Sequence, residues 1–162
     1  MTETTLCYLE KDGCYLLLHR VKKKQDINEG KWIGVGGKRE PGESPEDCAR
    51  REIREETGLT VQELRFRAVI TFLSDEWGEE MMYLFTSRQF TGELAECDEG
   101  ELAWVPVEEA EQLPTWEGDR IFLQRLRERE DFFSLKLVYH GEELVQAVLW
   151  EAGRERILRC QR

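Results

Sequence analysis

The sequence has few residues of the kinds that build zinc sites and disulfide frameworks. Its 162 residues include only two histidines, His19 and His140, and five scattered cysteines with no C-x-x-C pair. An odd number of irregularly spaced cysteines is typical of a reduced chain, and zinc sites need grouped ligands. We therefore expect a cytoplasmic protein without structural disulfides or zinc.

Long apolar runs and an excess of basic residues are also absent. No apolar stretch approaches the roughly 20 residues of a membrane helix, and residues 1–13 do not resemble a signal peptide. Lysine and arginine number 23 against 34 acidic residues, which gives a net charge of −11. Because nucleic acids and anionic membranes attract basic surfaces, we expect neither as a partner. There is no G-x-S-x-G motif, so nothing indicates a covalent nucleophile.

The length and the hydrophobic pattern predict one domain of mixed α and β structure. A chain of 162 residues can bury a core without staples, so we expect residues 1–162 to form a single domain and a monomer, with a weak dimer as the alternative. Periodicity and turn residues predict the elements. The expected strands are residues 4–9, 14–20, 32–35, 63–73, 81–90, 102–105, 133–139 and 144–150; the expected helices are 45–57, a short one opening at 106, and 117–130, with a charged loop at 22–30 and a turn at 74–80.

The helix at residues 45–57 has clear start and stop signals. Ser44 can cap the free backbone amides, Pro45 suits the first helical position, and Asp47 lies near the positive end of the helix dipole. Gly58 can adopt the left-handed conformation that ends a helix. The pattern predicts a helix with fixed ends.

Three glutamates share one face of this helix. Glu52, Glu55 and Glu56 are related as i, i+3 and i+4, and like charges at this spacing disfavour a helix by about 0.2–0.5 kcal/mol per pair. A hard divalent cation would remove the repulsion, and Mg2+ is the usual choice beside phosphates. The alternative is a solvated acidic face. We expect a magnesium site, in which Mn2+ could substitute.

The glutamates belong to a longer motif, since residues 37–59 read GKREPGESPEDCARREIREETGL. The fixed positions are Gly37, Glu43, Arg51, Glu52, Glu55, Glu56 and Gly58, with apolar Ile53 and Leu59. This pattern resembles the Nudix box, G-x5-E-x7-R-E-U-x-E-E-x-G-U with U apolar, and misses no defined position. The resemblance implies a magnesium-dependent hydrolase of diphosphate linkages in nucleoside diphosphate derivatives. It also implies an α/β/α Nudix sandwich with a mixed sheet, in which the box helix carries the metal site.

The same resemblance implies roles for neighbouring residues. A loop carbonyl at the position of Gly36 joins the metal ligands in the family, and Glu43 with Arg51 should form a salt bridge that orients the helix. Glu99 matches a carboxylate outside the box that binds metal or positions water; a solvated glutamate is the alternative. Lys38 either contacts phosphate or lies in solvent.

Segments outside the box narrow the expected substrate. Residues 31–38, KWIGVGGK, and 114–119, PTWEGD, are similar to diphosphatases that remove oxidised purine nucleoside triphosphates, such as 8-oxo-dGTP, from the nucleotide pool. In those relatives a tryptophan at the position of Trp116 stacks on the base, and a carboxylate matching Asp119 hydrogen-bonds to its edge. A flat π-face and a neighbouring carboxyl suit a purine.

Four further positions bear on substrate binding. Phe72 and Phe122 fall where relatives have pocket aromatics, but an aromatic on a strand or helix is equally expected in a core. Arg20 falls where relatives carry a basic residue near the phosphates; a solvated arginine is the alternative. Ile33 departs from relatives that read the base with an asparagine, and its side chain offers no hydrogen-bonding atoms.

The expected reaction is substitution at phosphorus by a metal-activated water, without a covalent intermediate. Glu52 is the first candidate for the general base and Glu99 the second. The alternatives are the same chemistry on ADP-ribose, a dinucleoside polyphosphate or an RNA 5′ end, and a non-catalytic nucleotide-binding module. Because the three helix glutamates are all retained, the sequence favours an enzyme.

Overall fold

The computed structural model describes residues 1–22 and 27–161, so residues 23–26 of the expected charged loop lie outside the described residues. The strands are β1 (Thr2–Lys11), β2 (Cys14–His19), β3 (Trp32–Ile33), β4 (Thr60–Val61), β5 (Arg65–Ser74), β6 (Gly78–Ser87), β7 (Phe90–Thr91), β8 (Glu101–Pro106), β9 (Phe133–His140), β10 (Glu143–Glu151) and β11 (Arg154–Cys160). The helices are α1 (Pro45–Thr57), α2 (Val107–Ala110) and α3 (Glu117–Glu128).

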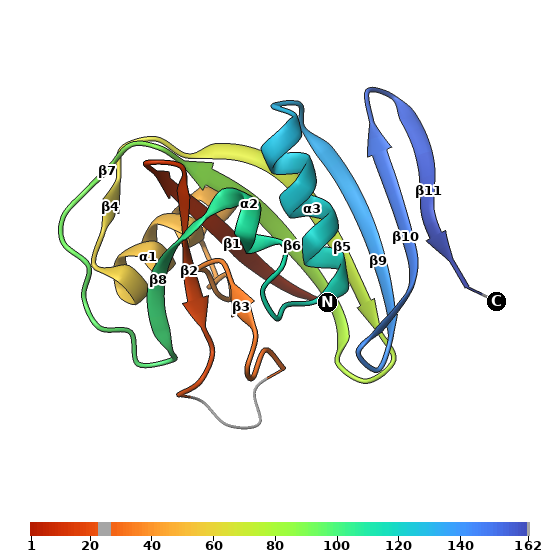
Figure 1. Cartoon of the computed structure of the whole chain (residues 1–162), viewed down its shortest axis with the longest axis horizontal. Helices are drawn as coiled ribbons and strands as arrows, with labels where there is room; N and C mark the ends of the chain where they lie inside the picture. The colour runs from red at the N-terminus through yellow and green to blue at the C-terminus, as the bar shows by residue number, and fades with distance from the viewer. Residues whose placement is uncertain (23–26, 162) are drawn as a thin grey trace.

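Most of these strands form one mixed sheet (Figure 1). Within the described residues its order is β11-β10-β9-β5-β6-β1-β2-β3, with β8 also paired to β2, and β4 and β7 form a separate two-stranded sheet. The pairs β1–β6 and β5–β9 are parallel, and the other pairs are antiparallel. In the described part of the chain, no helix is long and apolar enough to cross a membrane.

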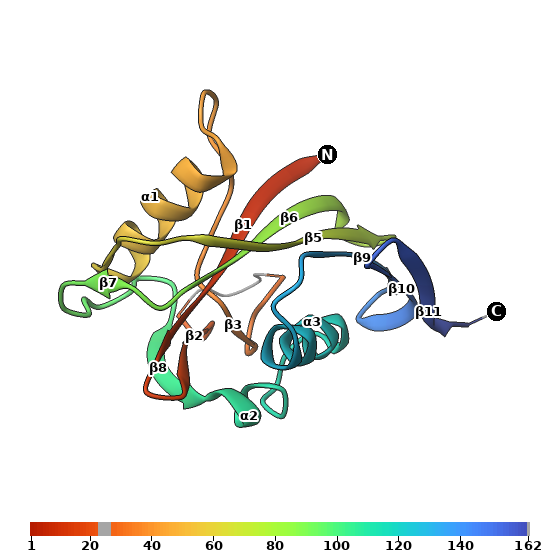
Figure 2. The same ribbon diagram turned by 90° about the horizontal axis from the view of Figure 1, so that it is seen from above.

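The helices α1 and α3 cover opposite faces of the sheet (Figure 2). Strand β1 contributes to both cores because successive side chains point to opposite faces. Tyr8 packs in the core under α3, which contains Phe122, whereas Cys7 packs in the core under α1, which contains Ile53. The predicted α/β/α sandwich is confirmed.

Helix α1 begins and ends where the sequence predicted. The Ser44 hydroxyl accepts a hydrogen bond from the Asp47 amide at 3.0 Å, and the Asp47 carboxylate accepts one from the Ser44 amide at 3.0 Å. Gly58 ends the helix with φ of 80°. These local caps fix the two ends of the helix, and the packing of Ala49 and Ile53 in the core sets which face carries the glutamates outward.

Three differences from the predicted elements have physical reasons. The turn predicted at residues 74–80 is shorter, because β6 already begins at Gly78 and its charged first residues pair with β5. Strand β11 was not predicted, since its side chains are exposed and show no apolar alternation. The strands β4 and β7 are two residues each, which is too short for a periodic signal.

Candidate active site

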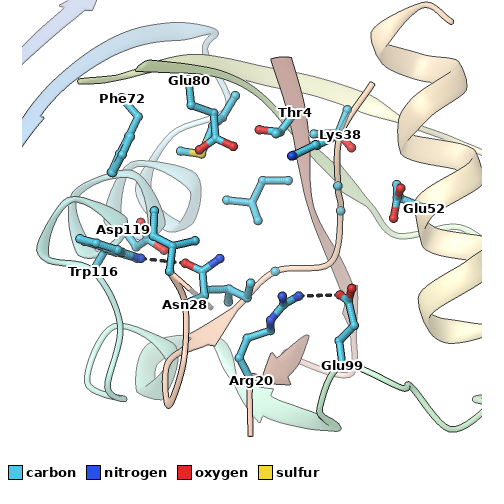
Figure 3. Close-up of a pocket in the computed structure, with 18 of the residues that line it drawn as sticks. Thr4, Arg20, Asn28, Lys38, Glu52, Phe72, Glu80, Glu99, Trp116 and Asp119 are labelled. Atoms are coloured by element: carbon cyan, nitrogen blue, oxygen red, sulfur yellow. Dashed lines mark hydrogen bonds and ion pairs between the residues drawn. The ribbon is translucent and has the colours of Figure 1, made fainter. Parts of the chain in front are cut away.

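A cavity of about 550 Å³ lies beside β1, between helix α1 and the start of α3 (Figure 3). Most residues proposed from the sequence line it: Arg20, Gly36, Gly37, Lys38, Glu52, Glu56, Phe72, Glu99, Trp116 and Asp119. Ile33 lines it as well. The chain thus brings together segments that are up to about a hundred residues apart in sequence.

One end of the cavity is acidic. Glu52 and Glu56 project from α1, and Glu99 comes from the loop before β8. The Gly36 amide donates to the Glu56 carboxylate at 3.2 Å, and Arg20 forms an ion pair with Glu99 at 2.6 Å. Burial, together with the charges of Glu99 and Glu52, raises the pKa of Glu56 to about 8. Carboxylates are therefore held close together in a site that favours positive charge.

Arg51 connects the helix to the preceding loop and to the acidic end. It donates to Glu43 at 2.7 and 3.0 Å, to Glu52 at 2.6 Å, and to the Lys38 carbonyl at 2.9 Å. The hydrogen bonds from Arg51 and from the Glu40 amide lower the pKa of Glu43 to about 2. Burial raises the pKa of Glu52, and Arg51 opposes that shift. The salt bridge expected between Glu43 and Arg51 is present, and the same guanidinium restrains Glu52.

The glycines of the loop leave room that a side chain would fill. A Cβ atom on Gly37 would lie 2.6 Å from the Glu52 carboxyl carbon, and one on Gly36 would lie 1.9 Å from the Thr5 carbonyl oxygen. A side chain at position 36 would clash with the backbone of β1, and one at position 37 would displace the Glu52 carboxylate.

The donor set fits a hard cation. Carboxylates and a backbone carbonyl are the ligands that Mg2+ and similar ions prefer. In residues 1–22 and 27–161, no three His, Cys, Asp or Glu side chains already stand as a formed metal-binding group. Glu55 does not line the cavity; its exposed carboxylate lies 3.3 Å from Arg51. Ligation by all three helix glutamates would thus require side-chain movement.

The other end of the cavity is aromatic. The Trp116 indole donates to Asn28 at 2.8 Å, and its ring lies edge-on to Phe72 with the centroids 5.6 Å apart. The Lys31 ammonium lies 4.6 Å from the centroid of the Trp116 ring. Asp119 is buried beside this cluster and accepts a hydrogen bond from the Thr115 hydroxyl at 3.2 Å. Burial raises the pKa of Asp119 to about 7.

The structure does not bring every proposed residue to the cavity. Phe122 is fully buried in the core, with its ring centroid 6.2 Å from that of Tyr8, so its side chain supports the sheet and does not line the cavity. Sequence reasoning missed Asn28 and Glu80, which both line the cavity. They lie in charged segments that the sequence assigned to a loop and a turn, and no motif distinguished them.

A family model described as the NUDIX domain matches residues 3–126. The chain belongs to the Nudix family. The Nudix hydrolase YvcI of Bacillus subtilis is 35% identical over 124 residues, which cover 74% of this chain and 75% of that protein. An oxidized purine nucleoside triphosphate hydrolase of Danio rerio is 35% identical over 126 residues, which cover 76% of this chain and 79% of that protein.

Solved structures of other proteins have the same fold over most of the chain. The crystal structure of the mutator MutT protein from Bacillus halodurans has a TM-score of 0.83 and 28% identity, and the match covers 92% of this chain and 97% of that one. The E. coli ORF135 protein has a TM-score of 0.66 and 29% identity over 78% of this chain and 89% of its own. The predicted Nudix fold and the prediction of an enzyme are confirmed.

Proposed function

We propose that this Nudix enzyme hydrolyses purine nucleoside triphosphates, including oxidised ones such as 8-oxo-dGTP, to the monophosphate and pyrophosphate. The observation that carries the proposal is the two-ended cavity, with Trp116 and Asp119 at one end and the acidic cluster at the other. A purine can stack on the indole while its triphosphate extends to the acidic end. The name of the Danio rerio relative supports this substrate class.

The acidic end would hold Mg2+, with Mn2+ as a substitute, through Glu52, Glu56, Glu99 and the Gly36 carbonyl, and with Glu55 after a side-chain rotation. When bound, the ion neutralises phosphate charge and lowers the pKa of water.

The chain's own groups would position the phosphates and accept the proton. Arg20 and Lys38 line the cavity and supply positive charge for the phosphate oxygens. Glu52 accepts the proton of the attacking water, because Arg51 fixes its orientation from one carboxylate oxygen. Glu99 is the second candidate for this role.

Asp119 would read the edge of the base. A carboxyl with a pKa near 7 can donate a hydrogen bond when protonated and accept one when ionised. The indole beside it is held by Asn28, so the base would meet a fixed surface. We further propose that residues 1–162 act as one domain and as a monomer in the cytoplasm.

The test is pyrophosphate release in Mg2+ from 8-oxo-dGTP, dGTP and dATP, with ADP-ribose and diadenosine polyphosphates assayed by their own products. We expect kcat/KM for 8-oxo-dGTP to exceed that for dGTP, and Glu56→Gln to abolish turnover of both. A preference for ADP-ribose or a dinucleoside polyphosphate would contradict the substrate and leave the hydrolase chemistry standing. Equal rates on 8-oxo-dGTP and dGTP would contradict selection of oxidised purines.

A further inference from the structure

Glu80 is a partly buried carboxyl in the cavity that the proposed chemistry does not use. It lies near the start of β6, opposite Phe72 of β5, and lines the cavity with Thr4 and Lys38. Burial raises the pKa of Glu80, and a hydrogen bond from the Thr4 hydroxyl and the charge of Lys38 oppose that shift. The carboxyl is therefore held in place by its neighbours and faces the ligand space.

The position of Glu80 is intermediate between the two ends of the cavity. Figure 3 shows Glu80, Thr4 and Lys38 along the sheet wall, with Trp116 and Asp119 on one side and Glu52 on the other. The backbone of Lys38 is held there by an isolated antiparallel β-bridge to Thr4 of β1. A nucleotide with its base at Trp116 and its phosphates at the acidic end would pass its sugar along this wall.

The chemistry of the wall suits a sugar hydroxyl better than a phosphate or a flat base. A carboxylate accepts hydrogen bonds and repels phosphate, whereas an ammonium only donates. A sugar hydroxyl can donate to the Glu80 carboxylate, while the Lys38 ammonium beside it serves the phosphate oxygens as proposed above. Neither group offers a stacking surface for a base, and in the proposed binding mode Asp119 already hydrogen-bonds to the base edge.

We propose that Glu80 accepts a hydrogen bond from a hydroxyl of the nucleotide sugar and so makes the enzyme select its substrate by the sugar. This inference rests on the proposed function, because it assumes a nucleoside triphosphate in this cavity. It adds a selection that is independent of the base.

The test compares ribo, 2′-deoxy and 3′-deoxy forms of one purine nucleoside triphosphate with the wild-type enzyme and with Glu80→Leu. In the wild type, removal of one of the two hydroxyls should lower kcat/KM about tenfold, as expected for a lost hydrogen bond to a charged group. In Glu80→Leu the same removal should change kcat/KM less than about twofold, because the acceptor is already absent.

Glu79→Leu is the matched control. Glu79 is the preceding residue of β6 and is exposed, and it lines a separate hollow with Asp75 and His140. This variant should retain the wild-type response to loss of the hydroxyl.

Three results would overturn the inference. They are a wild type indifferent to both hydroxyls, a hydroxyl effect that persists in Glu80→Leu, or a variant that changes the choice of base and not of sugar. Failure of the wild type to cleave any triphosphate would instead refute the proposed function, so the two failures are distinguishable.

Discussion

Replacing Asp119 by asparagine should change how the stability of the protein depends on pH. The carboxyl is only 6% exposed, and burial raises its pKa from the usual 3.8 to about 7 although the Thr115 hydroxyl opposes the shift. The folded state therefore keeps a proton that the unfolded chain releases at lower pH. The stability that this proton supplies is fully present below about pH 4 and is lost as the pH rises through about 7.

The size of the effect follows from the two pKa values. A rise from 3.8 to about 7 corresponds to about 4 kcal/mol, at about 1.36 kcal/mol for each pH unit. Asparagine has nearly the same shape and can still accept from Thr115, but it does not titrate. Relative to the wild type, the free energy of unfolding of Asp119→Asn should therefore increase by about 4 kcal/mol between about pH 4 and pH 8.

The assay is urea unfolding of both proteins at a series of pH values, followed by tryptophan fluorescence in the presence of EDTA. Asp131→Asn is the control, because Asp131 is exposed and pairs with Arg129 at the surface. Its difference from the wild type should stay nearly constant over this range. A constant difference for Asp119→Asn as well would refute the argument that burial keeps this carboxyl protonated.

Four further predictions concern the two ends of the cavity. Gly37→Ala should lower kcat on the order of 100-fold with little change in the urea midpoint, because its Cβ would displace the Glu52 carboxylate that lies 2.6 Å away. Trp116→Ala should raise KM for purine triphosphates about tenfold in steady-state kinetics, through loss of base stacking. EDTA should abolish turnover and Mg2+ should restore it. In differential scanning fluorimetry at pH 7, Glu56→Gln should raise the melting temperature of the metal-free protein and remove the stabilisation by Mg2+, since burial opposes the Glu56 charge.

The parts of the molecule that depend on local interactions could be predicted from the sequence. The first and last residues of α1 follow from Ser44, Asp47 and Gly58, which act within one or two turns. The partnership of Glu43 and Arg51 spans eight residues and was expected from the motif. Such features do not depend on how distant segments meet.

The parts that depend on tertiary contacts could not be predicted in the same way. Asn28 accepts a hydrogen bond from the Trp116 indole, although the two residues are 88 positions apart in the sequence. Nothing in the local sequence around either residue indicates this pair. Phe122 has the pattern of a core residue and of a pocket residue alike, and only the packing of α3 on Tyr8 decides between them. The acidic residues around Glu80 predicted a turn, and only the pairing of Glu80 with Phe72 of β5 shows that it belongs to a strand.

The acidic end is compatible with a folded protein because each carboxylate has its own fixed donor. Arg51 binds Glu52, Arg20 binds Glu99, and the Gly36 amide binds Glu56. These donors come from α1, the end of β2 and the glycine loop, so the cluster can form only after these segments have packed together. The net charge of −11 is therefore a poor guide to the site, since salt screens distant exposed charges much more than these close contacts. A divalent cation would bind the same three carboxylates that these donors hold, which couples its binding to the positions of Arg20 and Arg51.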